Sequence, residues 1–279
     1  MLFSRLFRIS LFTHTVIACG TALLCMQTQL YLGYSIQNPW LYLFLFFATL
    51  LSYNVHFWLA SRISNSSEQL DWFRSKQVWI HVLNLSSLLV VLLAGWQVRH
   101  LWLALLPAVV FNAAYTAPLF FKSELKLPLL FTFIKSYFIG FTWAYVTVIL
   151  PMDDLQHGFS TQIALLFVQR FLLVSIATLI FDWRDRFRDE QWGVRTPANL
   201  FTETQYRYFF LLNVLLYAAV VIQMAVLTGE AVHYMQLLLV PVMWNLYQKA
   251  NRQTKDSFYL LYVDGLLVLA PLLSLLLLF

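Results

Sequence analysis

The chain is dominated by long apolar segments that follow one another from residue 10 almost to its end. A helix needs about 20 mainly apolar residues to cross the hydrocarbon core of a bilayer, where the backbone must satisfy its own hydrogen bonds. Such segments lie near 10–33, 39–60, 77–97, 101–120, 128–150, 161–181, 204–227, 231–249 and 257–278. The sequence therefore predicts an all-α fold, a polytopic membrane helix bundle of about nine transmembrane helices.

The composition supports a single membrane-embedded domain. Hydrophobic residues make up 61% of the chain and charged residues only 11%, whereas soluble domains carry about 25% charged residues. No polar stretch reaches the length of about 50 residues that a separate domain needs, so residues 1–279 are expected to form one unit in the lipid bilayer. Cys19 and Cys25 are about 9 Å apart on one predicted helix, too far for a disulfide, and are interpreted as buried thiols.

The basic residues predict the orientation of the bundle. Lysine and arginine collect in cytoplasmic loops of membrane proteins. Alternate loops here carry almost all of them, in the N-terminal tail and after the second, fourth, sixth and eighth spans, whereas the opposite loops contain only Arg99. This predicts a cytoplasmic N-terminus and an outside C-terminus. The net charge of +5 thus follows the membrane topology, and no nucleic-acid partner is expected.

The strongest chemical signal is an aspartate series at the end of the sixth span. Asp182, Asp185 and Asp189 are spaced i, i+3 and i+7, which places them on one helix face. Carboxylates so arranged repel one another unless a cation joins them, and Mg²⁺ often links protein carboxylates to substrate phosphates. The pattern predicts a Mg²⁺ and diphosphate site. The alternative is a solvated helix end whose acids pair with the interleaved arginines.

Basic residues near this series are candidate phosphate ligands. Arg188 and Arg195 follow it, and arginine forms bidentate pairs with phosphate oxygens. Lys122 and Lys126 follow the Tyr115–Pro118 segment that closes the fourth span. For each of them, anchoring of the bundle at the cytoplasmic surface is the alternative.

Four polar residues inside the predicted spans are further candidates. Asn54 lies in the second span, Lys135 in the fifth, Arg170 in the sixth and Asp264 in the ninth. Ionisable groups within a bilayer usually face a cavity or a partner. Lys135 and Asp264 have similar predicted depths, so they could pair with each other. The alternative is a structural buried pair. His56, His81 and Trp58 are interpreted as packing or interfacial residues.

These residues resemble the UbiA-type superfamily of intramembrane prenyltransferases. The second family motif, Asp/Asn-x-x-Asp-x-x-x-Asp followed by Gly and Thr, corresponds here to Asp182, Asp185, Asp189, Gly193 and Thr196. Tyr115–Pro118 with the Lys122 loop is similar to the family segment between spans four and five. The nine-span layout, with long cytoplasmic loops after spans two and six, is also similar.

The first family motif, Asn-x-x-x-Asp-x-x-x-Asp, is degenerate in this chain. Its positions are occupied by Asn54, Trp58 and Arg62, and the loop beyond offers Glu68 and Asp71 at a different spacing. Arg62 could replace a metal by neutralising phosphate directly. Equally, catalysis could be weakened or lost.

The resemblance implies Mg²⁺-dependent transfer of a prenyl group from an isoprenyl diphosphate to a hydrophobic acceptor, aromatic or lipid. Asp182, Asp185 and Asp189 would hold the metal and Asn54 would position the diphosphate. Lys122, Lys126, Arg188, Arg195, Arg62 and Tyr115 would bind it, with Lys135, Arg170 and Asp264 as polar groups of the cavity. The expected location is the plasma (inner) membrane, with the site on the cytoplasmic side.

Three other functions remain open at this point. A non-catalytic protein of the same fold would bind a prenyl lipid or a partner, which the degenerate first motif favours. A small transporter would explain Lys135, Arg170 and Asp264 within the spans, but the broken helix pairs typical of transporters are not evident. A phosphotransferase for CDP-alcohols would need Asp-x-x-Asp-Gly, and Arg186 follows Asp185 instead.

Overall fold

The computed structural model describes residues 2–36, 38–63, 67–120, 135–154, 156–191, 195–250 and 254–278. Within these ranges all regular structure is helical, which confirms the predicted all-α class. The α-helices are α1 (Leu2–Phe12), α2 (Thr15–Tyr31), α3 (Pro39–Ile63), α4 (Glu68–Ser75), α5 (Gln77–Gln97), α6 (Trp102–Phe120), α8 (Lys135–Ala144), α9 (Leu150–Asp154), α10 (Thr161–Gln191), α11 (Pro197–Leu200), α12 (Glu203–Thr228), α13 (Leu239–Lys249), α14 (Asp256–Phe258) and α15 (Leu266–Leu278). Short 3₁₀ segments are η1 (Arg99–Leu101) and η3 (Ala231–Leu238), and π-helical turns are η2 (Tyr145–Ile149) and η4 (Tyr259–Val263).

Several helices have the length and composition of membrane spans. In the described part of the chain, five stretches are long and apolar enough: Pro39–Arg62, Gln77–Gln97, Thr161–Glu190, Glu203–Thr228 and Asp256–Leu275. Large apolar side chains on α5 and α6 are exposed, Trp79 at 72% and Leu103 at 83%, as expected of surfaces that contact lipid. A helical membrane protein with several spans is therefore supported. The count of nine and the side on which each end lies stay predictions.

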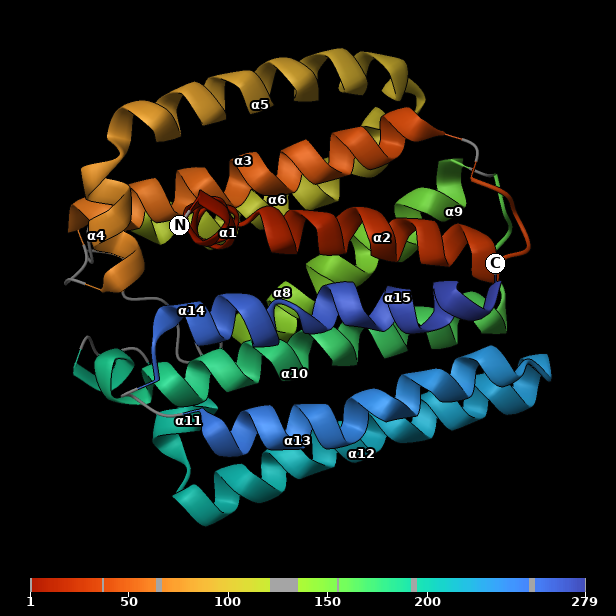
Figure 1. Ribbon diagram of the computed structural model, residues 1–279. Helices are drawn as coiled ribbons and strands as arrows, with labels where there is room; N and C mark the ends of the chain where they lie inside the picture. Colours follow the sequence, from red (N-terminus) through yellow and green to blue (C-terminus); the bar gives the residue numbers. More distant parts are fainter. Residues whose placement is uncertain are drawn as a thin grey trace.

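The long helices run side by side, and the connections gather at the two ends (Figure 1). The helices α4 and α11 and the start of α14 lie at one end, called here the α4 end, and the C-terminus lies at the other. The predicted span 10–33 is divided, because His14 adopts a left-handed conformation with φ of 60° between α1 and α2. As a result α1 is seen along its axis in Figure 1 and lies across the direction of α2.

Helix α10 is central to the bundle and packs against α8, α12 and α15. Its 31 residues extend about 46 Å at about 1.5 Å per residue, longer than the roughly 30 Å hydrocarbon core. Its last turns, which carry the three aspartates, can therefore extend beyond the apolar layer. Gly140 lets α8 approach closely, because a Cβ there would lie 2.7 Å from the carbonyl oxygen of Phe171 and against the hydroxyl of Ser175.

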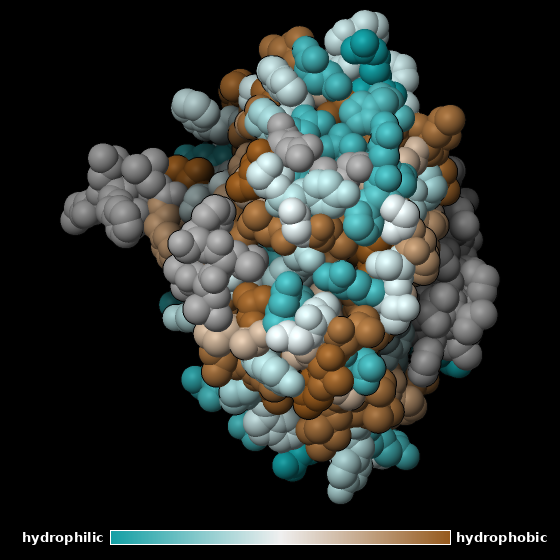
Figure 2. Space-filling view, turned by 90° about the vertical axis from the view of Figure 1, so that its right-hand side faces the viewer, coloured by the Kyte–Doolittle hydropathy of each residue, from teal (hydrophilic) through white to brown (hydrophobic). Residues whose placement is uncertain are grey.

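The end opposite to α4 carries its own polar contacts. Figure 2 faces this end and shows hydrophilic residues interspersed with hydrophobic ones. Asp154 Oδ1 accepts from Asn38 Nδ2 at 2.9 Å and lies 2.8 Å from His100 Nε2. The hydroxyl of Tyr34 lies 3.1 Å from His157 Nδ1. These contacts join the connections at that end and are separate from the aspartate series.

Candidate functional site

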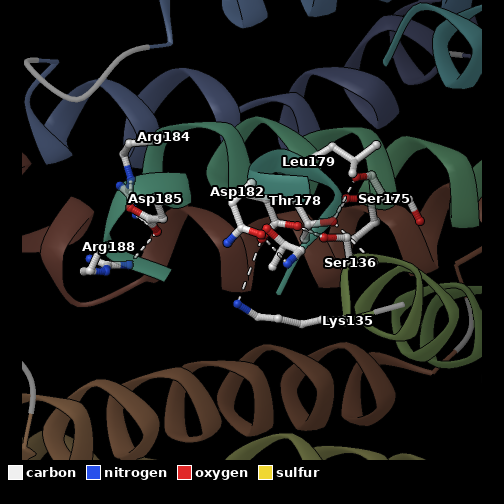
Figure 3. A network of polar contacts seen from close by, with 12 residues as sticks. Lys135, Ser136, Ser175, Thr178, Leu179, Asp182, Arg184, Asp185 and Arg188 are labelled. Carbon is white, nitrogen blue, oxygen red and sulfur yellow. Dashed lines mark hydrogen bonds and ion pairs between the residues drawn. The ribbon is translucent and has the colours of Figure 1, made fainter. Parts of the chain in front are cut away.

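The three aspartates of α10 lie at the α4 end, and Figure 3 shows that the side chains of Asp182 and Asp185 turn toward different partners. Asp182 and Asp189 are buried, at 5% and 7% exposure, and Asp185 is half-buried. Helical spacing places Asp182 and Asp189 at nearly the same angle around the axis, about 10 Å apart along it. The shared face predicted from the sequence is therefore present, but each of the three acids has different partners.

Asp182 is held by the first two residues of α8. The hydroxyl of Ser136 donates to Asp182 Oδ2, and Lys135 Nζ lies 3.9 Å from Oδ1 (Figure 3). The Lys135 ammonium also acts electrostatically on Asp185 and Asp189. One lysine from a neighbouring helix thus compensates part of the charge of all three acids.

Asp185 is neutralised by two arginines of its own helix. Arg184 Nε and one terminal nitrogen donate to its two oxygens at 2.8 and 2.9 Å, and Arg188 approaches Oδ2 at 2.6 Å. Arg184 also reaches Asp256 of α14 at 3.6 Å and lies over the ring of Tyr259 at 4.6 Å. Asp185 therefore fixes two guanidinium groups and links α10 to the start of α14.

Asp189 differs from the other two acids, because its Oδ2 is buried and has no hydrogen-bond partner among the described residues. A buried carboxylate oxygen without a donor loses the free energy of hydration without compensation. Mg²⁺ prefers such hard oxygen ligands and is commonly bound by one or two carboxylates together with substrate phosphates. The buried Asp189 Oδ2 is a donor of this kind and fits Mg²⁺ in that mode.

The structure does not bring all three predicted metal ligands around one point. Across the described ranges, no three carboxylate, imidazole or thiol groups lie close enough to hold a metal ion by protein atoms alone. The reason is that both oxygens of Asp185 face arginines rather than the space beside Asp182 and Asp189.

The residues at the predicted positions of the first motif make contacts of a different kind. Asn54 is fully buried, and its amide donates to the carbonyl of Thr13 at 3.1 Å, so it braces the junction between α1 and α2. The guanidinium of Arg62 lies 3.9 Å over the ring of Trp58, a geometry in which an arginine is attracted to an aromatic face. Trp58 in turn packs edge-on against His81.

The two acids of the following loop are paired with basic residues. Glu68 lies 3.0 Å from Arg8 of α1, and Asp71 lies 2.9 Å from Arg74 of its own helix. Glu68 therefore ties α4 to α1, whereas the pair of Asp71 and Arg74 lies within α4.

The remaining predicted phosphate ligands are less defined. Arg195 is exposed. Lys122 and Lys126 lie outside the described residues. Tyr115 is a residue of α6, but its side chain is not among the described ones.

The polar residues predicted within the spans lie in two places. Lys135 pairs with Asp182 and not with Asp264, whereas Asp264 is buried where Arg184 acts on it electrostatically. Arg170 is fully buried, and its guanidinium donates to Gln27 Oε1 at 2.8 Å. Gln27 also bonds Ser274 at 2.8 Å, so Arg170 belongs to a polar network between α2, α10 and α15.

A cavity of about 230 Å³ lies between α2, α3, α6 and α8. Its wall is mostly apolar and aromatic, with Phe44, Phe57, Phe111, Phe138 and Trp143 among the lining residues. Lys135, Arg170 and Asp264, predicted as its polar groups, are not among them. Phe138 and Ile139 of the lining follow Lys135 and Ser136 by one turn of α8, so the cavity begins next to the contact with Asp182.

Sequence reasoning missed Ser136, the role of Arg184 and the position of His56, which lines the cavity. The one available signal was the Lys135-Ser136 pair at the start of an apolar span, where two polar residues indicate a contact at the end of the bundle. The partners themselves come from helices far apart in the sequence.

Comparison with known proteins supports the fold. No family model and no curated protein matches the sequence. A solved structure of digeranylgeranylglyceryl phosphate synthase is similar with a TM-score of 0.53, over 96% of this chain and 97% of that one, at 12% sequence identity. At this identity the likeness shows a shared membrane helical fold over the whole chain.

Proposed function

We propose that this chain is an intramembrane prenyltransferase that moves a prenyl group from an isoprenyl diphosphate to a hydrophobic acceptor. The observation that carries the proposal is that an aromatic cavity begins next to a group of buried acids and partly exposed cations. This arrangement suits a ligand with a long apolar chain and a diphosphate at one end, because the chain would lie in the apolar cavity and the diphosphate beside the charged residues.

The charged part of the ligand would lie at the α4 end. Lys135 supplies a point charge, and Arg188 offers a planar guanidinium already oriented by Asp185. Asp182 and Asp189 would hold Mg²⁺, which when bound would neutralise negative charge on the leaving diphosphate. Arg195 and the lysines of the 121–134 segment stay proposed additional contacts.

The apolar part would lie in the cavity. Its aromatic side chains present ring faces, which stabilise a cation such as the one that develops on the allylic carbon when its C–O bond breaks. The likeness to a synthase whose product carries two geranylgeranyl groups supports prenyl chemistry on this fold. The acceptor and the length of the prenyl chain are left open by these features.

The test uses purified protein with radiolabelled geranylgeranyl diphosphate, Mg²⁺ and a panel of acceptors: 4-hydroxybenzoate, 1,4-dihydroxy-2-naphthoate and geranylgeranylglyceryl phosphate. We expect a labelled prenylated product that disappears with EDTA. Asp189→Asn should lower turnover about 100-fold or more, as for loss of one group that stabilises the developing charge. Glu190→Gln is the matched control, because Glu190 is the adjacent, exposed acid of α10.

Asp185→Asn separates two roles. Since Asp185 faces Arg184 and Arg188, its loss should raise the KM for the diphosphate without changing the Mg²⁺ requirement, whereas Asp189→Asn should raise that requirement. Saturable binding of the diphosphate without any product would instead assign the non-catalytic, lipid-binding function. Absence of both binding and product would refute the site.

A further inference from the structure

One polar stripe crosses the apolar cavity along α3. Thr49, Ser52, Tyr53 and His56 all line the cavity, and their spacing of three, four and seven residues places them on one helix face. Ser52 Oγ donates to Asn112 Oδ1 of α6 at 2.8 Å, and Thr49 Oγ1 donates to Thr21 of α2 at 3.1 Å. His56 is the member of this stripe that lies nearest to the α4 end.

The surroundings of His56 place it where the cavity meets the charged residues. The Lys135 ammonium of α8 acts on His56 electrostatically, and His56 in turn acts on His14 at the junction of α1 and α2. Lys135 is the residue that approaches Asp182. His56 therefore lies between the proposed diphosphate position and the apolar part of the ligand.

Prenyl transfer leaves one proton to be removed. The C1–O bond of the prenyl diphosphate breaks and its electron pair leaves on the diphosphate oxygen. An oxygen or ring carbon of the acceptor forms the new bond to C1, and the proton that this atom carried must pass to a base. In a mostly apolar cavity, a side chain of the lining is better placed to accept it than the surrounding groups are.

The described acids at the site are poorly placed for that step. Asp182 is held by Ser136 and Lys135, and Asp185 by two arginines. Asp189 is a further seven residues along α10 from Asp182 and so lies farther from the cavity. Among the described residues that line the cavity, the titratable ones are Tyr53 and His56, and a neutral tyrosine is a weak base.

We propose that His56 accepts the proton of the acceptor during prenyl transfer. This inference rests on the proposed function and assigns a catalytic role that the aspartate motifs do not contain. In this role the neutral imidazole takes the proton as the new bond forms, and the imidazolium releases it after the product leaves. Ser52, one turn deeper, is placed to orient a hydroxyl or carbonyl oxygen of the acceptor.

The test compares His56→Gln with His81→Gln. His81 lies on α5 against Trp58 and does not line the cavity, so it receives the same substitution without contact with the ligand. With the acceptor from the panel that the wild type prenylates, kcat of His56→Gln should fall about 100-fold, the lower range for loss of a general base. Binding of geranylgeranyl diphosphate should change less than about twofold, because the carboxylates and cations are intact.

The pH profile distinguishes a base from a packing residue. The wild-type kcat should fall on the acid side as the base becomes protonated, whereas His56→Gln should lose this dependence. Since His56→Gln could also disturb packing, His56→Gly is assayed with and without added imidazole, which should restore part of kcat. If His56→Gln has the kcat and pH profile of the wild type, and the wild type transfers the prenyl group, this inference is wrong and the proposed function stands. No transfer by the wild type with any acceptor would overturn the proposed function and this inference together.

Discussion

Gly140→Ala tests whether the close approach of α8 and α10 builds the site. An alanine Cβ at this position would lie 2.7 Å from the carbonyl oxygen of Phe171 and even closer to Ser175 Oγ. Ordinary contact begins at 3.4 Å, so the two helices must separate by about 0.7 Å. Ser175 can turn its hydroxyl away, but the Phe171 oxygen belongs to the backbone of α10 and cannot.

This displacement has two consequences of known size. Overpacking of a helix interface costs about 1–3 kcal/mol, which corresponds to a fall in Tm of roughly 2–5 °C for a chain of this length. Lys135 Nζ is already 3.9 Å from Asp182, so a further separation of this size takes the pair beyond contact distance. The hydrogen bond from Ser136 to Asp182 also weakens, and one to a charged group is worth about 1.5–3 kcal/mol.

Thermal unfolding in detergent and the prenyl transfer assay measure both consequences. Gly158→Ala is the matched control, because a Cβ there meets nothing within 4 Å. The double variant Gly140→Ala with Ser175→Ala should regain little stability, since the Phe171 oxygen stays in place. If Gly140→Ala has the Tm and activity of Gly158→Ala, the close approach of these helices does not position Asp182 and the reasoning is wrong.

Three further predictions concern stability and topology. Arg170 makes one described hydrogen bond, to Gln27. Arg170→Met should therefore change the free energy of unfolding by less than about 1 kcal/mol or raise it, whereas Gln27→Leu leaves the buried charge unpaired and should lower it by about 3–5 kcal/mol. Equal losses for the two variants in chemical denaturation would contradict this. Thr202→Ala removes the cap of α12, where Thr202 Oγ1 accepts from Gln205 N at 3.3 Å, and should cost about 0.5–2 kcal/mol and reduce hydrogen-exchange protection in the first turn. In sealed vesicles treated with protease from outside, a tag on one terminus should be cleaved and a tag on the other terminus protected. Cleavage of both tags, or protection of both, would refute the odd number of spans.

The sequence alone determined those properties that depend on neighbours along the chain. Apolar segments of sufficient length predict membrane helices because lipid leaves the backbone no other partner, and five described helices are long and apolar enough to be such spans. The 3.6-residue period also predicts that Asp182 and Asp189 share one helix face. The pairing of Lys135 with Asp264 was wrong, since predicted depth in the membrane does not say which helices are neighbours.

Only the tertiary structure decided which side chains meet. Ser136 and Asp182 are 46 residues apart, and they touch because Gly140 lets their helices pack closely. The arginines that neutralise Asp185 were visible in the sequence, but their rotamers and the contact with Asp256 depend on packing at the α4 end. His56 lines a cavity that exists only between four helices. Periodicity is fixed by the geometry of the backbone, whereas contacts between distant helices follow from the shapes of all the side chains that separate them.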